Sequence, residues 1–201
     1  MSSLKLKHSG GNSVIIAAPS SNPAADRTIT CPDLTANAVM ATTNGITEFD
    51  QWYLNTGTVS SNGDITSNLT RMDFAGSAAQ IGTGMTQSNG IFTFPRTGKF
   101  LIVCNASLNC DGSDTVILYT AITTNNSSYT NVALAMDGNN GTGNRTGAAT
   151  SFFLLDVTDT SQVKAKFVVG SISGGSSIRG TADSSTDAVT TNFVFIRLGD
   201  T

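Results

Sequence analysis

Side chains able to carry catalysis are scarce in this chain of 201 residues, which holds one histidine, His8, and one glutamate, Glu48. His8 stands among glycine, serine and lysine near the amino end, so a Ser–His–Asp site is not expected. Asp156 and Asp159, in the sequence DVTDT, offer a carboxylate pair of the kind that cleaves glycosidic bonds. They also fit a polar turn between two strands, where aspartate serves local hydrogen bonds. We favour the turn and predict that the protein is not an enzyme.

Two polar loops carry the oxygen ligands that calcium prefers. The sequence DGSD holds Asp111 and Asp114, and DGNNGTGN holds Asp137 and Asn140 with further amides. The closing glutamate of the twelve-residue calcium loop is absent from both. We therefore interpret them as polar loops without an ion and expect no cofactor and no metal, while calcium binding stays an open alternative.

Aromatic side chains near these loops suggest recognition rather than catalysis. Tyrosine rings and amide groups together favour the shallow binding of a glycan, through ring stacking and hydrogen bonds. The candidate recognition residues are Asp111, Tyr119, Tyr129, Asp137 and Asn140.

Composition limits the classes of partner. Only 12% of the residues are charged, about half of the usual share of roughly 25%, and the net charge is −3. No cluster of Lys and Arg is present to neutralise phosphates, so nucleic acid is not an expected partner. The amino end MSSLKLKHSGG lacks the apolar core of a secretory signal, and no apolar run reaches the length of a membrane span. We expect no membrane insertion.

An all-β fold has to position these loops. Ser, Thr, Asn and 20 Gly take the place of helix-forming charged residues. Beyond residue 45, strand-like runs alternate with polar turns and show no helical periodicity, which is typical of an antiparallel sandwich or jelly roll. The expected strands are Phe49–Leu54, Leu69–Phe74, Ile91–Phe94, Phe100–Leu108, Thr115–Ile122, Val132–Met136, Ser151–Val157, Val163–Val169 and Asn192–Leu198.

Three runs are apolar on both faces, although successive side chains of a strand point to opposite sides. The runs are Phe100–Val103, Phe152–Leu155 and Phe193–Ile196, whereas Val163–Val169 has lysines along one side. A sandwich has one interior, so the second apolar face needs another layer or another subunit, and we predict self-association. Leu101 and Val103, or the opposite set, would face the neighbour. The predicted interface residues are Phe100, Leu101, Ile102, Val103, Phe193, Val194, Phe195 and Ile196.

Residues 1–44 differ in texture from residues 45–201, with a junction expected in the sequence ATTNG. Gly and Pro divide the segment into short extended pieces, Leu4–Lys7, Val14–Ala17 and Arg27–Cys31. Segments near or below about 40 residues bury too little apolar surface to fold alone, so we expect copies of itself or another protein to hold this one. The predicted anchor residues are Leu4, Leu6, Val14, Ile15, Ile16 and Ile29.

The stretch MTQSNGIFTFPRTGKFLIVCNASL, Met85 to Leu108, resembles a hallmark of the complement-q and tumour-necrosis-factor-like trimeric jelly rolls. The family's pattern of glycines, spaced aromatics and proline is matched by Gly90, Phe92, Phe94, Pro95, Gly98 and Phe100. SFFLLDVTDTSQVKAKF and TNFVFIRLGD are similar to its late strand pair and its terminal strand, so the resemblance covers roughly residues 46–201. It implies a jelly-roll head that forms a homotrimer, with the terminal strand buried near the three-fold axis.

Residues 1–44 resemble another group, the lead segment of virion appendage proteins of marine tailed bacteriophages, cyanophages in particular. The resemblance rests on LKLKHSGGNS, SSNP and DRTITCPD. Together the two resemblances imply a virion protein that is assembled in the host bacterial cytoplasm. It would be a fibre, knob or capsid decoration, held to other virion proteins by residues 1–44 and contacting a host surface glycan. A cellular or secreted jelly-roll binding module is the alternative, and a surface-glycan depolymerase is a third.

Overall fold

The structure, a computed structural model, describes residues 3–7, 10–11, 13–17, 45–55, 57–73, 80–180 and 189–201. The chain divides into two compact units, Met1–Ala41 and Thr42–Thr201. The described residues contain no helix that is long and apolar enough to cross a membrane.

The first unit contains a two-stranded antiparallel hairpin, β1 (Ser3–Lys7) and β2 (Ser13–Ala17). Leu4 lies opposite Ile16, and Leu6 lies opposite Val14. Two of the expected extended pieces therefore pair with each other, with Ile15 opposite Lys5. The third piece, which includes Ile29, lies outside the described residues.

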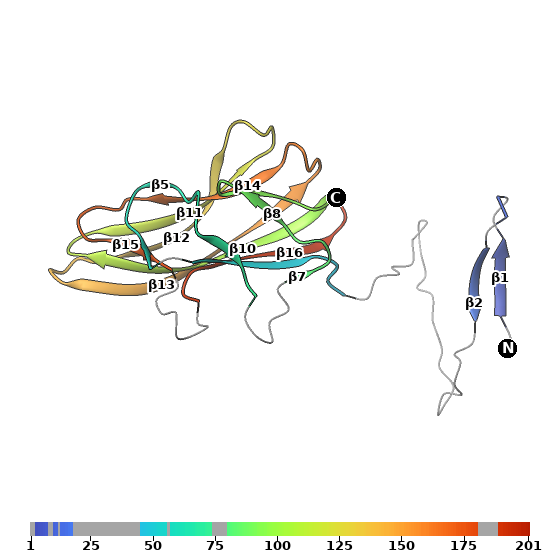
Figure 1. Cartoon of the computed structure of the whole chain (residues 1–201), viewed down its shortest axis with the longest axis horizontal. Coiled ribbons are helices and arrows are strands. Elements are labelled where there is room, and N and C mark those ends of the chain that lie inside the picture. Colours follow the sequence, from blue (N-terminus) through green and yellow to red (C-terminus); the bar gives the residue numbers. More distant parts are fainter. Residues whose placement is uncertain are drawn as a thin grey trace, which may run out of the picture. The chain divides into compact units, whose positions relative to one another are not determined.

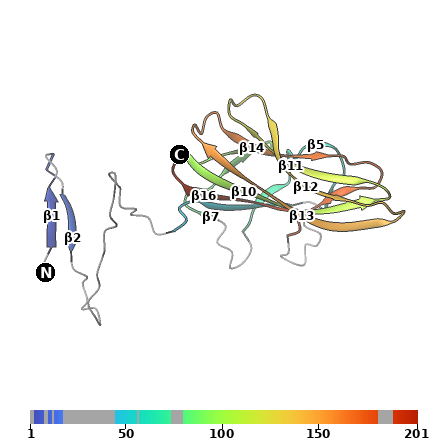
Figure 2. The ribbon, with the colours of Figure 1, turned by 180° about the vertical axis from the view of Figure 1, so that it is seen from behind.

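The second unit is built from two antiparallel sheets, which Figures 1 and 2 show as two layers. The first, called here the β10 sheet, consists of β13 (Asn144–Val157), β10 (Gly98–Asp111), β16 (Asn192–Gly199), β3 (Phe49–Leu54), β6 (Leu69–Arg71), β7 (Gln80–Ile81), β15 (Ser177–Arg179) and β4 (Thr58–Val59). The second, called the β11 sheet, consists of β12 (Thr130–Gly138), β11 (Thr115–Thr123), β14 (Lys164–Gly170), β9 (Ile91–Thr93), β8 (Thr86–Ser88) and β5 (Gly63–Asp64).

The predicted all-β jelly roll is confirmed, and the expected run Phe49–Leu54 coincides with β3. The largest extensions beyond the expected ranges are in two strands: β10 continues past Leu108 to Asp111, and β13 begins at Asn144 rather than at Ser151. Their extensions pair with each other along a polar stretch, where apolar patterning gives no signal. The short strands β4, β5, β7, β8 and β15 were not expected, because two or three residues carry no periodicity.

The core lies between the two sheets and is rich in phenylalanine. Phe167 of the β11 sheet stacks on Phe193 of the β10 sheet with ring centroids 3.8 Å apart. Phe92 contacts Phe195 across the sandwich in a tilted arrangement, with ring centroids 5.0 Å apart. Such pairs add about 0.5–1.5 kcal/mol each beyond the area that they bury, so these rings hold the layers in register.

Two turns of the hallmark stretch require glycine: Gly90 lies between β8 and β9 of the β11 sheet, and Gly98 is the residue at which β10 of the other sheet begins. Gly90 has φ +79°, and a Cβ there would lie 2.0 Å from the carbonyl oxygen of Ile65. Gly98 has φ +137°, and a Cβ there would lie 2.5 Å from the carbonyl oxygen of Gly199. Only glycine fits both the backbone angle and the space at these positions. Pro95 lies in the turn between β9 and β10.

Candidate subunit interface and recognition residues

The outward face of the β10 sheet carries two rows of apolar side chains across four strands. In one row Leu101 lies opposite Leu154 on one side and Ile196 on the other, and Ile196 lies opposite Phe49. In the next row Val103 lies opposite Phe152 and Val194. Residues directly opposite one another share a sheet face, so the rows form one continuous patch.

This patch is exposed in the single chain. Phe152 is 72% exposed, Leu154 is 55% exposed, and Ile81, which lies opposite Phe49, is 44% exposed. Single exposed apolar residues are ordinary, whereas a contiguous cluster marks a surface that another body covers. The patch, called here the apolar face, consists of Phe49, Ile81, Leu101, Val103, Phe152, Leu154, Val194 and Ile196.

The structure divides the predicted interface residues between two sides of the sheet. Phe100, Ile102, Phe193 and Phe195 are fully buried in the core of the chain itself. These four were expected at a subunit contact but lie between the two sheets. They alternate with the outward residues along β10 and β16, so their side chains point inward. Leu101, Val103, Val194 and Ile196 are half-buried on the outward face, where a neighbour can reach them. The contact stays a prediction for this second set.

The outward face becomes polar further along β10. Asn105 donates through Nδ2 to Oδ1 of Asn192 (2.9 Å) and accepts from Thr150 Oγ1 (2.8 Å). A further bond joins Thr146 Oγ1 to Asn109 Oδ1 (3.2 Å). The apolar face therefore occupies only the part of the sheet near Phe49, the end at which the chain enters the second unit.

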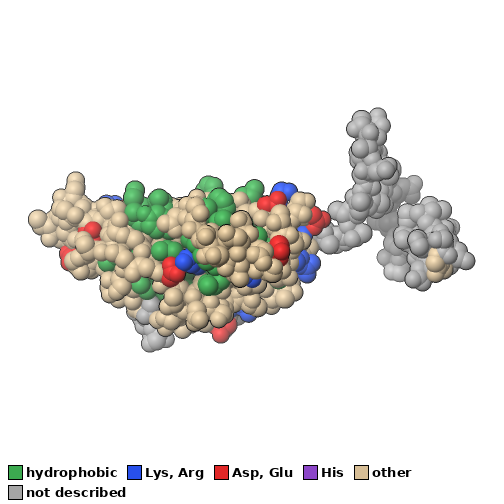
Figure 3. Space-filling view, turned by 90° about the horizontal axis from the view of Figure 1, so that it is seen from above, with side chains coloured by type: hydrophobic (Ala, Val, Ile, Leu, Met, Phe, Trp, Pro, Cys, Tyr) green, Lys and Arg blue, Asp and Glu red, His purple; other side chains and the backbone are tan. Residues whose placement is uncertain are grey.

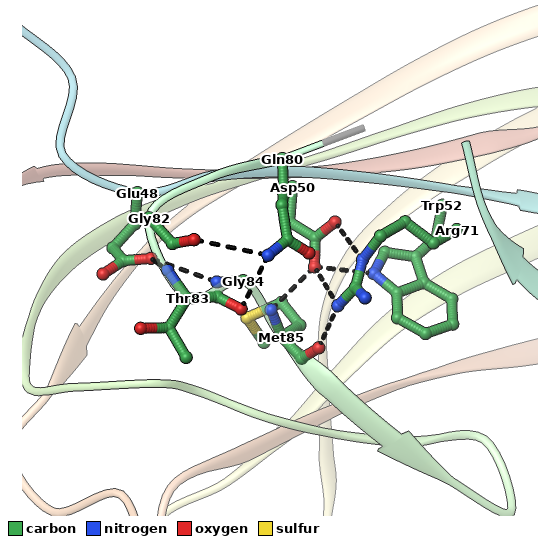
Figure 4. A network of polar contacts seen from close by, with 9 residues as sticks. All are labelled: Glu48, Asp50, Trp52, Arg71, Gln80, Gly82, Thr83, Gly84 and Met85. Atoms are coloured by element: carbon green, nitrogen blue, oxygen red, sulfur yellow. Dashed lines mark hydrogen bonds and ion pairs between the residues drawn. The ribbon is translucent and has the colours of Figure 1, made fainter. Parts of the chain in front are cut away.

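A cluster of polar contacts stands at the β7 edge of the apolar face (Figure 4). Asp50 is buried, and its Oδ2 accepts hydrogen bonds from Trp52 Nε1 (2.9 Å) and from the backbone N–H of Met85 (2.6 Å). Arg71 Nε lies 2.9 Å from Asp50 Oδ1, and its guanidinium also donates to the carbonyl of Met85 and covers the Trp52 ring at 4.8 Å. The carboxylate thus ties β3, β6 and the start of β8 together.

Glu48 holds the turn that follows β7. Its buried Oε2 accepts from the backbone N–H groups of Thr83 (2.8 Å) and Gly84 (3.2 Å), while Oε1 forms an ion pair with Arg96 Nε at 2.7 Å. A Cβ on Gly82 would lie 2.4 Å from Glu48 Oε2, so the turn closes around the carboxylate. We call these residues the Glu48–Asp50 cluster. Because both carboxylates already have cationic and N–H partners, the cluster has a structural role and holds Ile81 beside Phe49.

Three of the five candidate recognition residues lie around the far end of β10. Asp111 is the last residue of this strand, about 30 Å beyond Leu101 at roughly 3.3 Å per residue, while Asp137 lies on β12 of the other sheet. The Asp111 carboxylate lies against Gly175, where a Cβ would be 2.3 Å from Oδ2. Asp137 forms an ion pair with Arg145 (3.3 Å), and Asn140 is exposed in the loop between β12 and β13. Among the described residues, no group of three acidic, histidine or cysteine side chains is placed to hold a metal ion.

The two tyrosines lie elsewhere, on the outward side of the β11 sheet. Tyr119 lies on β11, opposite Leu134 and Val168. Lys166 Nζ stands 4.3 Å from the centre of the Tyr129 ring. The sequence could not separate these two places, because which loops meet depends on strand pairing between distant segments.

The two aspartates considered as a catalytic pair have different structural surroundings. Asp159 accepts hydrogen bonds from the N–H and the hydroxyl of Ser161, both at 2.7 Å, and these bonds lower the pKa of its carboxyl group. Asp156 lies on β13, opposite Lys99. Asp159 therefore serves the turn before β14, as its place in the sequence suggested.

Comparison with known proteins places the fold. No family model and no curated protein matches the chain. Among solved structures, Eiger TNF from S. frugiperda is similar, with a TM-score of 0.56 and 13% identity over 76% of this chain and 93% of that one. Murine APRIL is similar too, with a TM-score of 0.51 and 9% identity over 75% of this chain and 98% of that one. At these identities the likeness shows a TNF-like jelly-roll fold and nothing about a shared role.

Proposed function

We propose that this chain is a non-enzymatic structural and binding protein, which forms a homotrimer through the apolar face and belongs to the virion of a tailed bacteriophage. The apolar face is the observation that carries the proposal. Burying a few hundred Å² of it in each subunit would contribute several kcal/mol, at about 25 cal/mol per Å². The TNF-like fold and the resemblance to trimeric jelly rolls support three copies about an axis.

The attachment to a virion rests on residues 1–44. Their resemblance to phage appendage segments is supported by a physical argument: an isolated two-stranded hairpin such as β1–β2 is marginally stable and needs a surrounding structure. In a trimer held together by the apolar face, three such segments would start from the same end of the head, because Phe49 belongs to that face. They would then be free to enter one common attachment site on other virion proteins.

A cellular or secreted binding module is the second candidate function. The likeness to Eiger TNF and murine APRIL over most of their length favours it. It shares the trimer with the first proposal and differs in the partner of residues 1–44.

Mass spectrometry of purified particles of the phage that encodes the chain separates the two candidates. We expect peptides of this chain in the particles, and we expect a variant lacking residues 1–44 to be absent from them. Particles that lack the full-length chain would contradict the virion role and leave the binding module.

A further inference from the structure

The outward side of the β11 sheet presents a tyrosine that is held by a glycine. The Tyr119 ring packs directly against Gly170 of β14, where a Cβ would lie 2.7 Å from Cε2 of the ring. Any larger residue at this position would push the ring away from the sheet. One side of the ring therefore packs on the backbone of β14, which fixes the position of the ring.

A depression of about 250 Å³ lies beside this ring. A β-bulge lies at the same place: Thr120 pairs with Ala133 and Ala121 pairs with Asn131, so Val132 is an extra residue in β12. The depression is lined by Tyr119, Asn131, Val132, Ala133 and Leu134. It thus combines an aromatic ring, an exposed amide and an apolar wall.

The surrounding charge is balanced. None of the lining residues is charged, and the cation on the neighbouring strand, Lys166, forms an ion pair with Asp64 at 2.7 Å and also covers the Tyr129 ring. A ligand in the depression would therefore meet no free positive charge, which disfavours carboxylated or phosphorylated ligands.

Apolar side chains frame the depression. Leu134 is 46% exposed and Met136 on the same strand is 53% exposed. Seen from above, the second unit shows several groups of hydrophobic side chains among mostly polar ones (Figure 3). The surface around the depression is apolar and shallow, which suits a flat ligand that has one apolar side and hydrogen-bonding groups at its rim.

We propose that this depression binds one neutral sugar ring of a glycan, with the apolar side of the sugar on Tyr119. The negative face of an aromatic ring attracts the weakly positive C–H groups of such a sugar. The Asn131 amide, with two donors and an acceptor, takes its hydroxyl groups. The proposal rests on the proposed function as a binding head, and it names the ligand class and the place.

Saturation-transfer NMR on the full chain tests the site, with the methyl glycosides of glucose, galactose and N-acetylglucosamine as probes. We expect transfer to the C–H protons of at least one of them. Tyr119→Phe should keep the transfer, whereas Tyr119→Ala and Gly170→Ala should weaken binding by about tenfold or more. Asn131→Ala should weaken it as well, while Asn55→Ala removes an exposed amide that directly follows β3 in the β10 sheet and should have no effect. Circular dichroism verifies that each variant is folded.

Three results would overturn the proposal: no transfer to any of the three glycosides, equal transfer in Tyr119→Ala, or stronger binding of methyl glucuronide, which carries a negative charge. The oligomeric state of the same samples keeps this test apart from the proposed function. A trimer without sugar transfer removes the sugar site alone. A monomer with Tyr119-dependent transfer removes the trimer and keeps the site.

Discussion

At the scale of single residues, two of the few carboxylates in the chain stabilise the edge of the β10 sheet. Glu48, its single glutamate, directly precedes β3, and Asp50 is the second residue of that strand; both are buried and flank the outward Phe49. Inward carboxylates bind the turn after β7 while the outward phenylalanine joins the apolar face. Glu48, which has no visible role in the sequence, thus helps to position Ile81 in the apolar face.

Asp50→Asn tests this role. The substitution removes the charge that pairs with Arg71, and we expect the free energy of unfolding to fall by about 1.5–3 kcal/mol, the range for hydrogen bonds to charged groups. Urea denaturation at fixed protein concentration measures the change. Asp64→Asn is the matched control, because Asp64 is part of an exposed pair worth less than about 1 kcal/mol. Equal losses in the two variants would mean that the cluster does not hold the fold.

Burial also decides the reactivity of the cysteines on β10. Burial raises the pKa of the Cys104 thiol to about 12 and raises the pKa of Cys110 as well. Only the thiolate attacks alkylating reagents, and three pH units below a pKa about one thiol in a thousand is ionised. In a variant that carries both Cys31→Ser and Cys110→Ser we therefore expect no labelling of Cys104 by iodoacetamide up to about pH 9 until denaturant is added. Rapid labelling of the native protein would show that β10 is not packed as described.

At the scale of elements, alternation along a strand identifies two apolar faces but not which of them is inward. The sequence correctly indicated that β10, β13 and β16 are apolar on both sides, yet only their pairing with one another places Leu101 outward and Phe100 inward. The position of Ile81 was beyond prediction, because β7 has two residues and is held by Glu48 from a distant part of the chain. Local sequence patterns therefore predict where the strands are, whereas long-range contacts determine which face of each strand points inward.

Two neighbouring residues of β10 therefore predict opposite effects. Phe100→Ala should lower the free energy of unfolding by roughly 3–5 kcal/mol, because it leaves a cavity in the core. Leu101→Ser should leave the fold of each subunit largely intact and weaken association instead. Urea denaturation and analytical ultracentrifugation of both variants separate the two effects. Should both variants lose stability equally and keep their association, the assignment of the two faces is wrong.

At the scale of the whole molecule, the outward face of the β10 sheet is apolar toward one end of β10 and polar toward the other. The apolar face lies near Phe49, and the hydrogen-bonded Asn and Thr side chains lie along the other part of β10. Association through the apolar part would leave the loops around Asp111 and Asn140 free at the opposite end. The arrangement suits a head that is held at one end and presents the other. A jelly roll of this kind serves many unrelated roles, so the role must be tested on the assembly.

Sedimentation equilibrium of the full-length chain at micromolar concentration is the most direct test of the trimer. We predict a mass three times that of the 20.8 kDa chain. A variant carrying both Phe152→Ser and Leu154→Ser should return to the mass of one chain and keep its β-sheet circular dichroism, because it removes the two most exposed residues of the apolar face. A wild-type chain that sediments as a monomer, or a double variant that stays trimeric, would contradict the account.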